Sequence, residues 1–248
     1  VLISAPWDVT VSYGAGAAEA PDAIIEASMQ LDLYDELSPG AWRRGIATAD
    51  IDYTLLESSQ RLRSDAVRVI RYLEEGGSVA DDAVVRKIRR VNEGCCVMNE
   101  NIRAQARMWL AQGKLVGLVG GDHSTPYGLV QALGERGDGF GILHIDAHCD
   151  LRRAYEGFEY SHASIMYNIL RDVPQVERIV EVGVRDYCDA EAERAHTSER
   201  IRMFNDTELF SAAFEGRAWG DQCRRIVAEL PERVYVSFDI DGLSVEYC

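Results

Sequence analysis

GFGILHIDAHCD, residues 139–150, is the stretch of sequence that decides the fold. It is an apolar run that ends in Asp146, His148 and Asp150. Because side chains alternate along a strand, these three residues are expected to lean toward one side and converge on a cation. A single Asp at this place would be an ordinary polar strand end. Crowded carboxylates, however, raise one another's pKa unless a cation compensates them, so the stretch predicts half of a metal site.

Two further apolar segments end in residues of the same kind. Residues 114–119 run into Gly120-Gly121-Asp122-His123-Ser124, and the last expected strand, residues 233–241, ends in Asp239 and Asp241. Strands that alternate with helices predict an α/β protein with a mainly parallel sheet. Such sheets bind ligands outside the carboxyl ends of their strands, which is where the three polar groups fall.

Hydrophobic spacing and glycine or proline signals place the other elements. Helices are expected at 20–28, around 64–73, through a long apolar stripe from Ile88 to Trp109, and at about 219–230. Strands are expected near the first residues and at 45–51, 178–184 and 201–204.

Composition limits the partners. The chain has 248 residues, 47% of them hydrophobic, and 41 acidic against 26 basic residues give a net charge of -15. This charge disfavours nucleic acid and an anionic membrane surface, and favours a cationic small molecule. No apolar run approaches the ~20 residues that span a bilayer, so a cytoplasmic location is expected. The cysteines, at 95, 96, 149, 188, 223 and 248, lack framework spacing and are expected to be reduced thiols.

Four carboxylates and two imidazoles are available: His123, Asp146, His148, Asp150, Asp239 and Asp241. This set exceeds the needs of one tetrahedral zinc ion and suits two divalent ions roughly 3.5–4 Å apart. Oxygen-rich ligation favours two Mn(2+) ions, with Ni, Co, Fe or Zn left open. Because paired cations lower the pKa of water, metal-assisted hydrolysis is the expected reaction class.

Three motifs resemble those of the ureohydrolase family, which includes arginases and agmatinases. They are GGDHS at 120–124, DAHCD at 146–150 and SFDIDGL at 237–243, and SYG at 12–14 and LDLYD at 31–35 extend the similarity. The resemblance implies a three-layer α/β/α fold, a binuclear manganese centre, urea release, and a homo-oligomer that is a trimer or hexamer.

The resemblance also implies site roles. One ion is implied to take His123, Asp146, Asp150 and Asp239, and the other Asp146, His148, Asp239 and Asp241. His162 resembles the family's active-site His, which is implied to carry a proton to the leaving amine, and Asp150 is placed with it among the catalytic residues.

Departures from the arginase pattern indicate the substrate. Arg152 and Phe158 stand where arginases carry Asn and Ser, and Cys188 stands in place of a second Asp, while residues 156–164 are similar to agmatinases. Agmatine is therefore expected to be preferred over arginine. Arg152 is also able to attract a carboxylate, which keeps guanidinobutyrate and guanidinopropionate open.

Two other classes of function also fit the sequence. A single-zinc deacetylase-like enzyme would use an Asp-x-His pair plus another Asp, leaving three of the candidate ligands surplus. A non-catalytic binding homologue is the second alternative. Residues 1–248 are expected to form one ureohydrolase domain that lacks the family's C-terminal closing segment.

Overall fold

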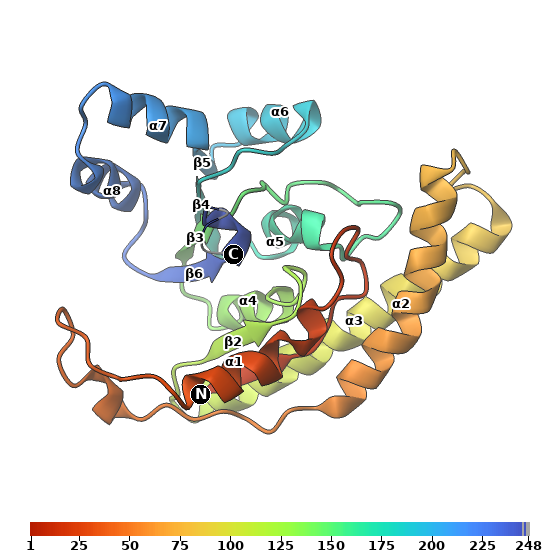
Figure 1. The fold of residues 1–248 in the computed structure, drawn as a ribbon, viewed down its shortest axis with the longest axis horizontal. Coiled ribbons are helices and arrows are strands. Elements are labelled where there is room, and N and C mark those ends of the chain that lie inside the picture. The colour runs from red at the N-terminus through yellow and green to blue at the C-terminus, as the bar shows by residue number, and fades with distance from the viewer. Residues whose placement is uncertain (245, 247–248) are drawn as a thin grey trace. The chain divides into compact units, whose positions relative to one another are not determined.

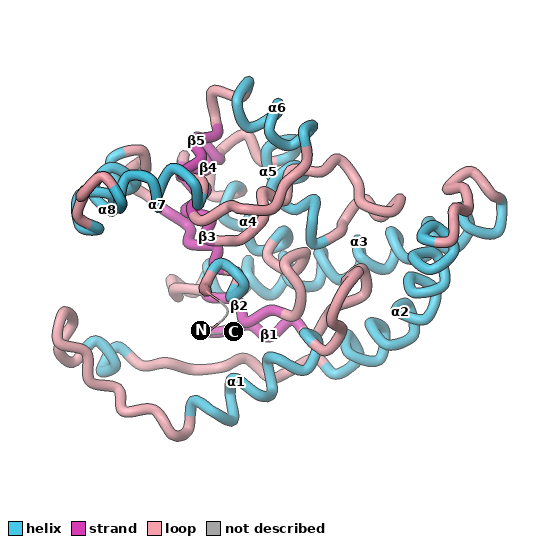
Figure 2. Tube along the Cα trace, turned by 45° about the horizontal axis from the view of Figure 1, so that its top comes forward, coloured by secondary structure: helices cyan, strands magenta, loops and turns pink. Residues whose placement is uncertain are grey.

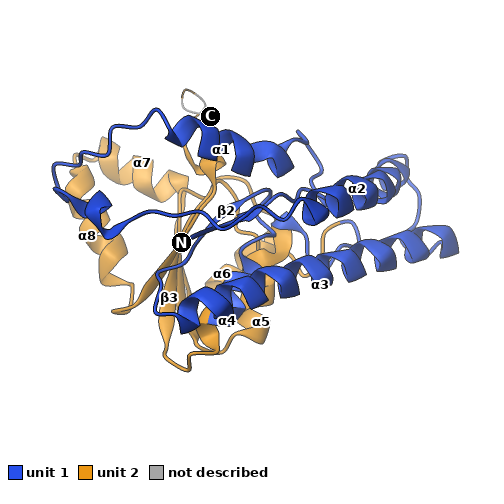
Figure 3. Cartoon of the chain, turned by 90° about the horizontal axis from the view of Figure 1, so that it is seen from below, with its two compact units in different colours: residues 1–132, 156–162 blue, residues 133–155, 163–248 orange. Residues whose placement is uncertain are grey.

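The computed structural model describes residues 1–244 and 246, and the chain forms two compact units (Figure 3). Residues 1–132 and 156–162 make the first unit, and residues 133–155 and 163–248 make the second. The first contains β1 (Leu2–Ala5), α1 (Ala20–Ser28), α2 (Tyr53–Glu74), α3 (Asp82–Ala111), β2 (Gly117–Gly120) and most of α4 (Tyr127–Gly134). The second contains β3 (Phe140–Ile145), α5 (Ile165–Asp172), β4 (Val176–Val182), α6 (Asp189–Thr197), β5 (Ile201–Phe204), α7 (Asp206–Phe214), α8 (Trp219–Ala228) and β6 (Val234–Phe238).

The first unit is built on a parallel pair of strands, β1 and β2. Leu2 pairs with Gly117 and Ala5 with Gly120. The chain beyond β2 stays hydrogen-bonded to the end of β1 and to the segment after it, because the Gly121 amide donates to the Ala5 carbonyl and the Asp122 amide to the Trp7 carbonyl, each at 2.8 Å. Strand β2 thereby fixes where the GGDHS turn begins.

Two long helices, α2 and α3, run side by side in the first unit (Figures 1 and 2). Helix α2 begins at an Asp52 N-cap, whose carboxylate accepts the Thr54 amide at 3.0 Å. At Gly94 the helices approach so closely that an added Cβ would lie 2.2 Å from a Leu62 methyl. The apolar stripe predicted along α3 is therefore a packing face, as the burial of Cys95 and Met98 also shows.

The second unit is built on a four-stranded parallel sheet in the order β5-β4-β3-β6. On one face, Leu143 and Val180 pack with Leu209 of α7 and Ile226 of α8. Helix α5 lies on the opposite face (Figure 3). An inner parallel strand covered on both faces must be apolar along its length, which is why β3 reads as a continuous apolar run.

Several sequence expectations need correction. Residues 45–51 do not form a strand; Thr48 only makes an isolated bridge to Leu2. The expected helix around 64–73 begins earlier, at Tyr53, and β6 ends at Phe238, before Asp239 and Asp241. Helix 20–28 and strand 201–204 form as predicted.

Two further observations concern composition. Cys95, Cys96, Cys149, Cys188 and Cys223 are free thiols, and Cys248 lies outside the described residues. None of the helices in the described part of the chain combines the length and apolar character that crossing a bilayer requires.

The start of the GGDHS turn offers a test of the packing in the first unit. A Cβ on Gly121 would lie 1.8 Å from the Trp7 carbonyl oxygen, which is backbone and cannot move aside cheaply. Gly121→Ala should therefore lower the free energy of unfolding by about 2–3 kcal/mol, as measured by urea denaturation. Gly220→Ala on α8, where the nearest side-chain atom is 3.7 Å away, is the matched control and should be neutral or stabilising. Equal stability of the two variants would contradict the close contact.

Candidate metal centre

Asp146 is the central residue of the cluster at the carboxyl end of β3. It is 1% exposed, and its two carboxylate oxygens have different neighbours. Oδ2 lies 2.9 Å from His144 Nε2, and Oδ1 accepts the His148 amide at 2.7 Å. These contacts fix the orientation of the carboxylate.

His148 lies between two carboxylates. Its Nδ1 is 3.2 Å from Asp241 Oδ2 and 3.4 Å from Asp146 Oδ1. Hydrogen bonds to Asp146 and then Asp241 raise the pKa of His148 to about 10, against the opposing effect of burial. Asp146, His148 and Asp241 each offer a ligand atom within 4.8 Å of the others, so the structure brings these three predicted ligands together.

Asp241 reaches this position through a short 3₁₀ turn, Ile240–Gly242, that follows β6. Asp239 precedes the turn; its amide donates to Ile145 at 2.9 Å, and its carboxylate accepts the Asp241 amide at 3.3 Å. Asp241 in turn accepts the Ala147 amide at 3.2 Å. Backbone contacts thus place the third motif directly beside the second.

The Arg185 guanidinium holds the same turn from the β4 side. It donates to the carbonyls of Asp241, Gly242 and Leu243, with distances of 3.5 Å to Gly242 and 3.1 Å to Leu243. Because Asp241 supplies a candidate ligand, Arg185 acts on the cluster through the backbone that carries that ligand.

A second group consists of His144, Asp146 and Asp150, whose ligand atoms also lie within 4.8 Å of one another. Asp150 has a positive φ of 53°, an unusual conformation for a residue other than glycine. Its carbonyl accepts the amides of Met166 and Tyr167 at 3.1 and 3.2 Å, which ties the ligand loop to the start of α5. His144 is a site residue that the sequence reasoning missed, although it continues the alternate spacing of 146, 148 and 150.

Buried acidic groups surround this second group. Glu181 of β4 pairs in register with His144 and is fully buried. Burial, followed by the negative charges of Asp150 and Asp146, raises the pKa of Glu181 well above its ordinary value. Burial and the charge of Glu181 likewise raise the pKa of the Cys149 thiol. Such an environment is costly for anions and favours a bound cation.

His123 and His162 belong to the first unit. His123 lies in a turn that Asp122 organises, because the Asp122 carboxylate accepts the Ser124 amide at 2.9 Å. Burial raises the pKa of Asp122 to about 6. His162 begins a 3₁₀ turn, and its Nδ1 lies 3.4 Å from the Ser161 hydroxyl. The metal role of His123 and the proton-transfer role of His162 stay predictions.

The donor set of the second unit fits a divalent metal. It contains carboxylates and the imidazoles of His144 and His148, within ligand distance of one another in each group, and a cation would stabilise the charged form of the buried acids around them. Asp239 belongs to neither group among the described residues, so its ligand role stays a prediction.

A parallel α/β sheet with Asp and His clusters at its carboxyl ends is typical of metal-dependent hydrolases. The arginase-family model matches residues 1–248, and the chain belongs to the arginase family. The members of this family are hydrolases that act on guanidino C–N bonds and depend on a binuclear metal centre. The predicted family, enzyme class and α/β fold class are thereby confirmed.

Several similar proteins carry the names of agmatine-type ureohydrolases. An N(1)-aminopropylagmatine ureohydrolase from Thermus thermophilus is 29% identical over 248 residues, covering 98% of this chain and 67% of the relative. A mitochondrial agmatinase from Gallus gallus is 27% identical over 202 residues, covering 76% of this chain and 56% of the relative. The solved agmatine ureohydrolase of Thermoplasma volcanium has a similar fold, with a TM-score of 0.66 at 20% identity, covering 99% of this chain and 68% of that one. The chain therefore spans between about half and two thirds of the length of these proteins.

Metal binding tests the two ligand groups. Asp146 is shared by both, so Asp146→Ala should weaken Mn(2+) binding at both ions, by at least about 100-fold, because a lost ligand costs more than a lost supporting residue. Asp241→Ala should weaken only one. Isothermal titration with Mn(2+) and elemental analysis of the full-length protein measure the effect. Asp221→Ala, at an exposed position of α8, is the control, and a parent protein that holds one ion per chain would contradict the binuclear centre.

Proposed function

We propose that the protein hydrolyses the guanidino group of agmatine or a closely related amine. Water adds at the guanidino carbon, the bond to the alkyl nitrogen breaks, and urea and a primary amine leave. The grouping of Asp146, His148 and Asp241 in an arginase-family chain is the observation that carries this proposal. The agmatine-type names of its relatives support the choice of substrate.

The proposed metal centre holds two Mn(2+) ions, with Ni, Co, Fe or Zn as alternatives. His123, Asp146, Asp150 and Asp239 would hold one ion, and Asp146, His148, Asp239 and Asp241 the other. When bound, the metal supplies a nucleophile at neutral pH by lowering the pKa of water.

The protein's own residues then have separate tasks. His144 and the His148 amide hold the Asp146 carboxylate in one orientation. The turn with Asp239 and Asp241 is held by backbone hydrogen bonds and by Arg185. His162 is proposed to give a proton to the departing alkyl nitrogen. Without that proton the nitrogen would have to leave as an amide anion, which is a poor leaving group.

The wider context is part of the same proposal. We place the protein in the cytoplasm, as a single ureohydrolase domain in a trimeric or hexameric homo-oligomer, acting on a small cationic substrate. The surplus of acidic over basic residues supports a cationic substrate. Family membership disfavours the deacetylase reading, and an activity assay separates an enzyme from a non-catalytic homologue.

A urea-release assay on the Mn-loaded, full-length protein tests the substrate. The panel is agmatine, N1-aminopropylagmatine, arginine, guanidinobutyrate, guanidinopropionate and guanidine. The highest kcat/KM is expected for an agmatine-type amine, because Cys188 cannot pair with the α-amino group of arginine as an Asp at this position would. A higher kcat/KM for arginine would contradict the substrate assignment, and release of urea from none of them would contradict the proposed function.

The role of His162 has its own kinetic test. His162→Ala should lower kcat by about 10²–10⁴-fold while Mn(2+) content stays the same, since general acid catalysis is typically worth that much. His196→Ala, at an exposed position of α6, is the matched control and should leave kcat unchanged. Loss of metal in His162→Ala would instead make His162 a ligand, and an unchanged kcat would make it structural.

A further inference from the structure

Arg152 lies two residues after Asp150 in the chain and belongs to the second unit. Its side chain is only partly exposed, because the guanidinium has neighbours on two sides. Nε lies 3.4 Å from Glu191 Oε2, and the guanidinium carbon lies 4.9 Å from the centroid of the Tyr155 ring. Arg152 is thus held between a carboxylate and an aromatic face, two contacts that suit a planar cation.

Glu191 is well placed to keep this contact. Its side chain is 4% exposed, and its two oxygens accept the amides of Leu151 and Cys188, each at 3.1 Å. Leu151 follows the ligand Asp150, and Cys188 caps the start of α6. Since two backbone amides fix the carboxylate, it has little freedom to move away and release Arg152.

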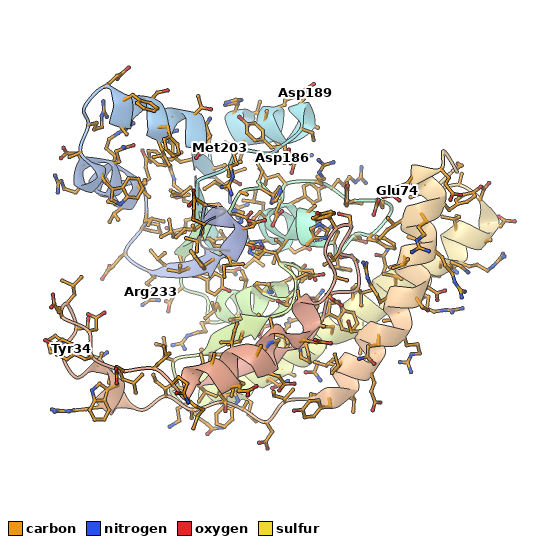
Figure 4. The ribbon with its side chains drawn as sticks, in the orientation of Figure 1. Tyr34, Glu74, Asp186, Asp189, Met203 and Arg233 are labelled. Carbon is orange, nitrogen blue, oxygen red and sulfur yellow. The ribbon has the colours of Figure 1, made fainter. Side chains whose placement is uncertain are left out.

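The loop that carries Cys188 presents negative charge beside the cluster. Asp186 is 85% exposed, lies 4.0 Å from His148 Nε2, and shares a backbone bridge with His148. Asp186 lies on the segment between β4 and α6, and Asp189 is the first residue of α6 (Figure 4). Arg185, their neighbour, is turned to the carbonyls of the Asp241 turn. The local field beside His148 therefore favours a positive group.

We propose that Glu191 sets the charge that the site accepts at the far end of its substrate. By neutralising Arg152 it withdraws the guanidinium that would otherwise pair with a carboxylate. The site then takes guanidino compounds with a cationic far end and disfavours guanidino acids, whose carboxylate would face the like charge of Asp186 without a cation to pair with. This inference rests on the proposed guanidino hydrolysis and names the residues that decide its substrate class.

The test compares kcat/KM for agmatine and 4-guanidinobutyrate in the Mn-loaded, full-length protein. The parent should favour agmatine by at least about tenfold, because one unfavourable charge contact with 4-guanidinobutyrate is enough to produce a difference of that size. Glu191→Gln keeps an oxygen to accept an amide but frees Arg152, so it should shift the ratio toward 4-guanidinobutyrate by about tenfold or more. Adding Arg152→Gln to Glu191→Gln should return the ratio close to that of the parent.

Glu193→Gln, on the exposed side of the same helix, is the matched control and should leave the ratio unchanged. Circular dichroism checks that each variant folds. If Glu191→Gln does not fold, Arg152→Gln alone decides. It should widen the preference for agmatine, because the charge of Glu191 then lacks its partner, and an unchanged preference would contradict the role of Glu191.

Binding of putrescine and 4-aminobutyrate, measured by thermal shift, gives a readout that does not need turnover. The parent should bind putrescine in preference, and Glu191→Gln should bind 4-aminobutyrate better than the parent does. A parent preference for 4-guanidinobutyrate, or a ratio that Glu191→Gln leaves unchanged, overturns the role of Glu191. Absence of urea from every guanidino compound overturns the proposed function instead, and the binding preference then still decides the role of Glu191.

Discussion

The close approach of Gly242 to Asp146 is the constraint on which the candidate metal-binding residues depend. A Cβ at position 242 would lie 3.0 Å from the Asp146 amide nitrogen and 3.1 Å from its Cα, tighter than side chains ordinarily tolerate. The pairing of β3 with β6 brings the two chain segments together, and the missing side chain lets the turn after β6 come the last distance. Only then does Asp241 reach both the Ala147 amide and His148.

Much of this arrangement could be predicted from the sequence because it depends on local patterns. The apolar run of β3 requires cover on both faces, and polar residues at the ends of parallel strands must meet at one sheet edge. Residues 146, 148 and 241 are indeed brought together in the second unit. The stripe along α3 and the proline in the first turn of α1 were equally readable, since each follows from spacing or from a fixed φ.

Other features depend on distant contacts that spacing does not encode. The argument from strand alternation was wrong in detail: β3 ends at Ile145, and Asp150 adopts a positive φ instead of an extended one. Segment 45–51 has strand-like composition but meets β1 only at Thr48, so no ladder forms. The grip of Arg185 on the carbonyls of the Asp241 turn joins residues more than fifty positions apart, and nothing in the local sequence indicates it.

Charge connects the metal centre to the substrate. Asp146, Asp150 and Glu181 concentrate acidic groups in a buried region, where burial and mutual repulsion both favour a cation nearby. A bound divalent metal would be the largest charge at its ligands, so it would offset the acidic groups that lie close to it. Asp186 lies farther out on the solvent side, and Glu191 already has Arg152 as its partner. The excess of negative charge that favours a metal within the cluster therefore extends to its rim, where, in the proposed reaction, it would act on the far end of the substrate.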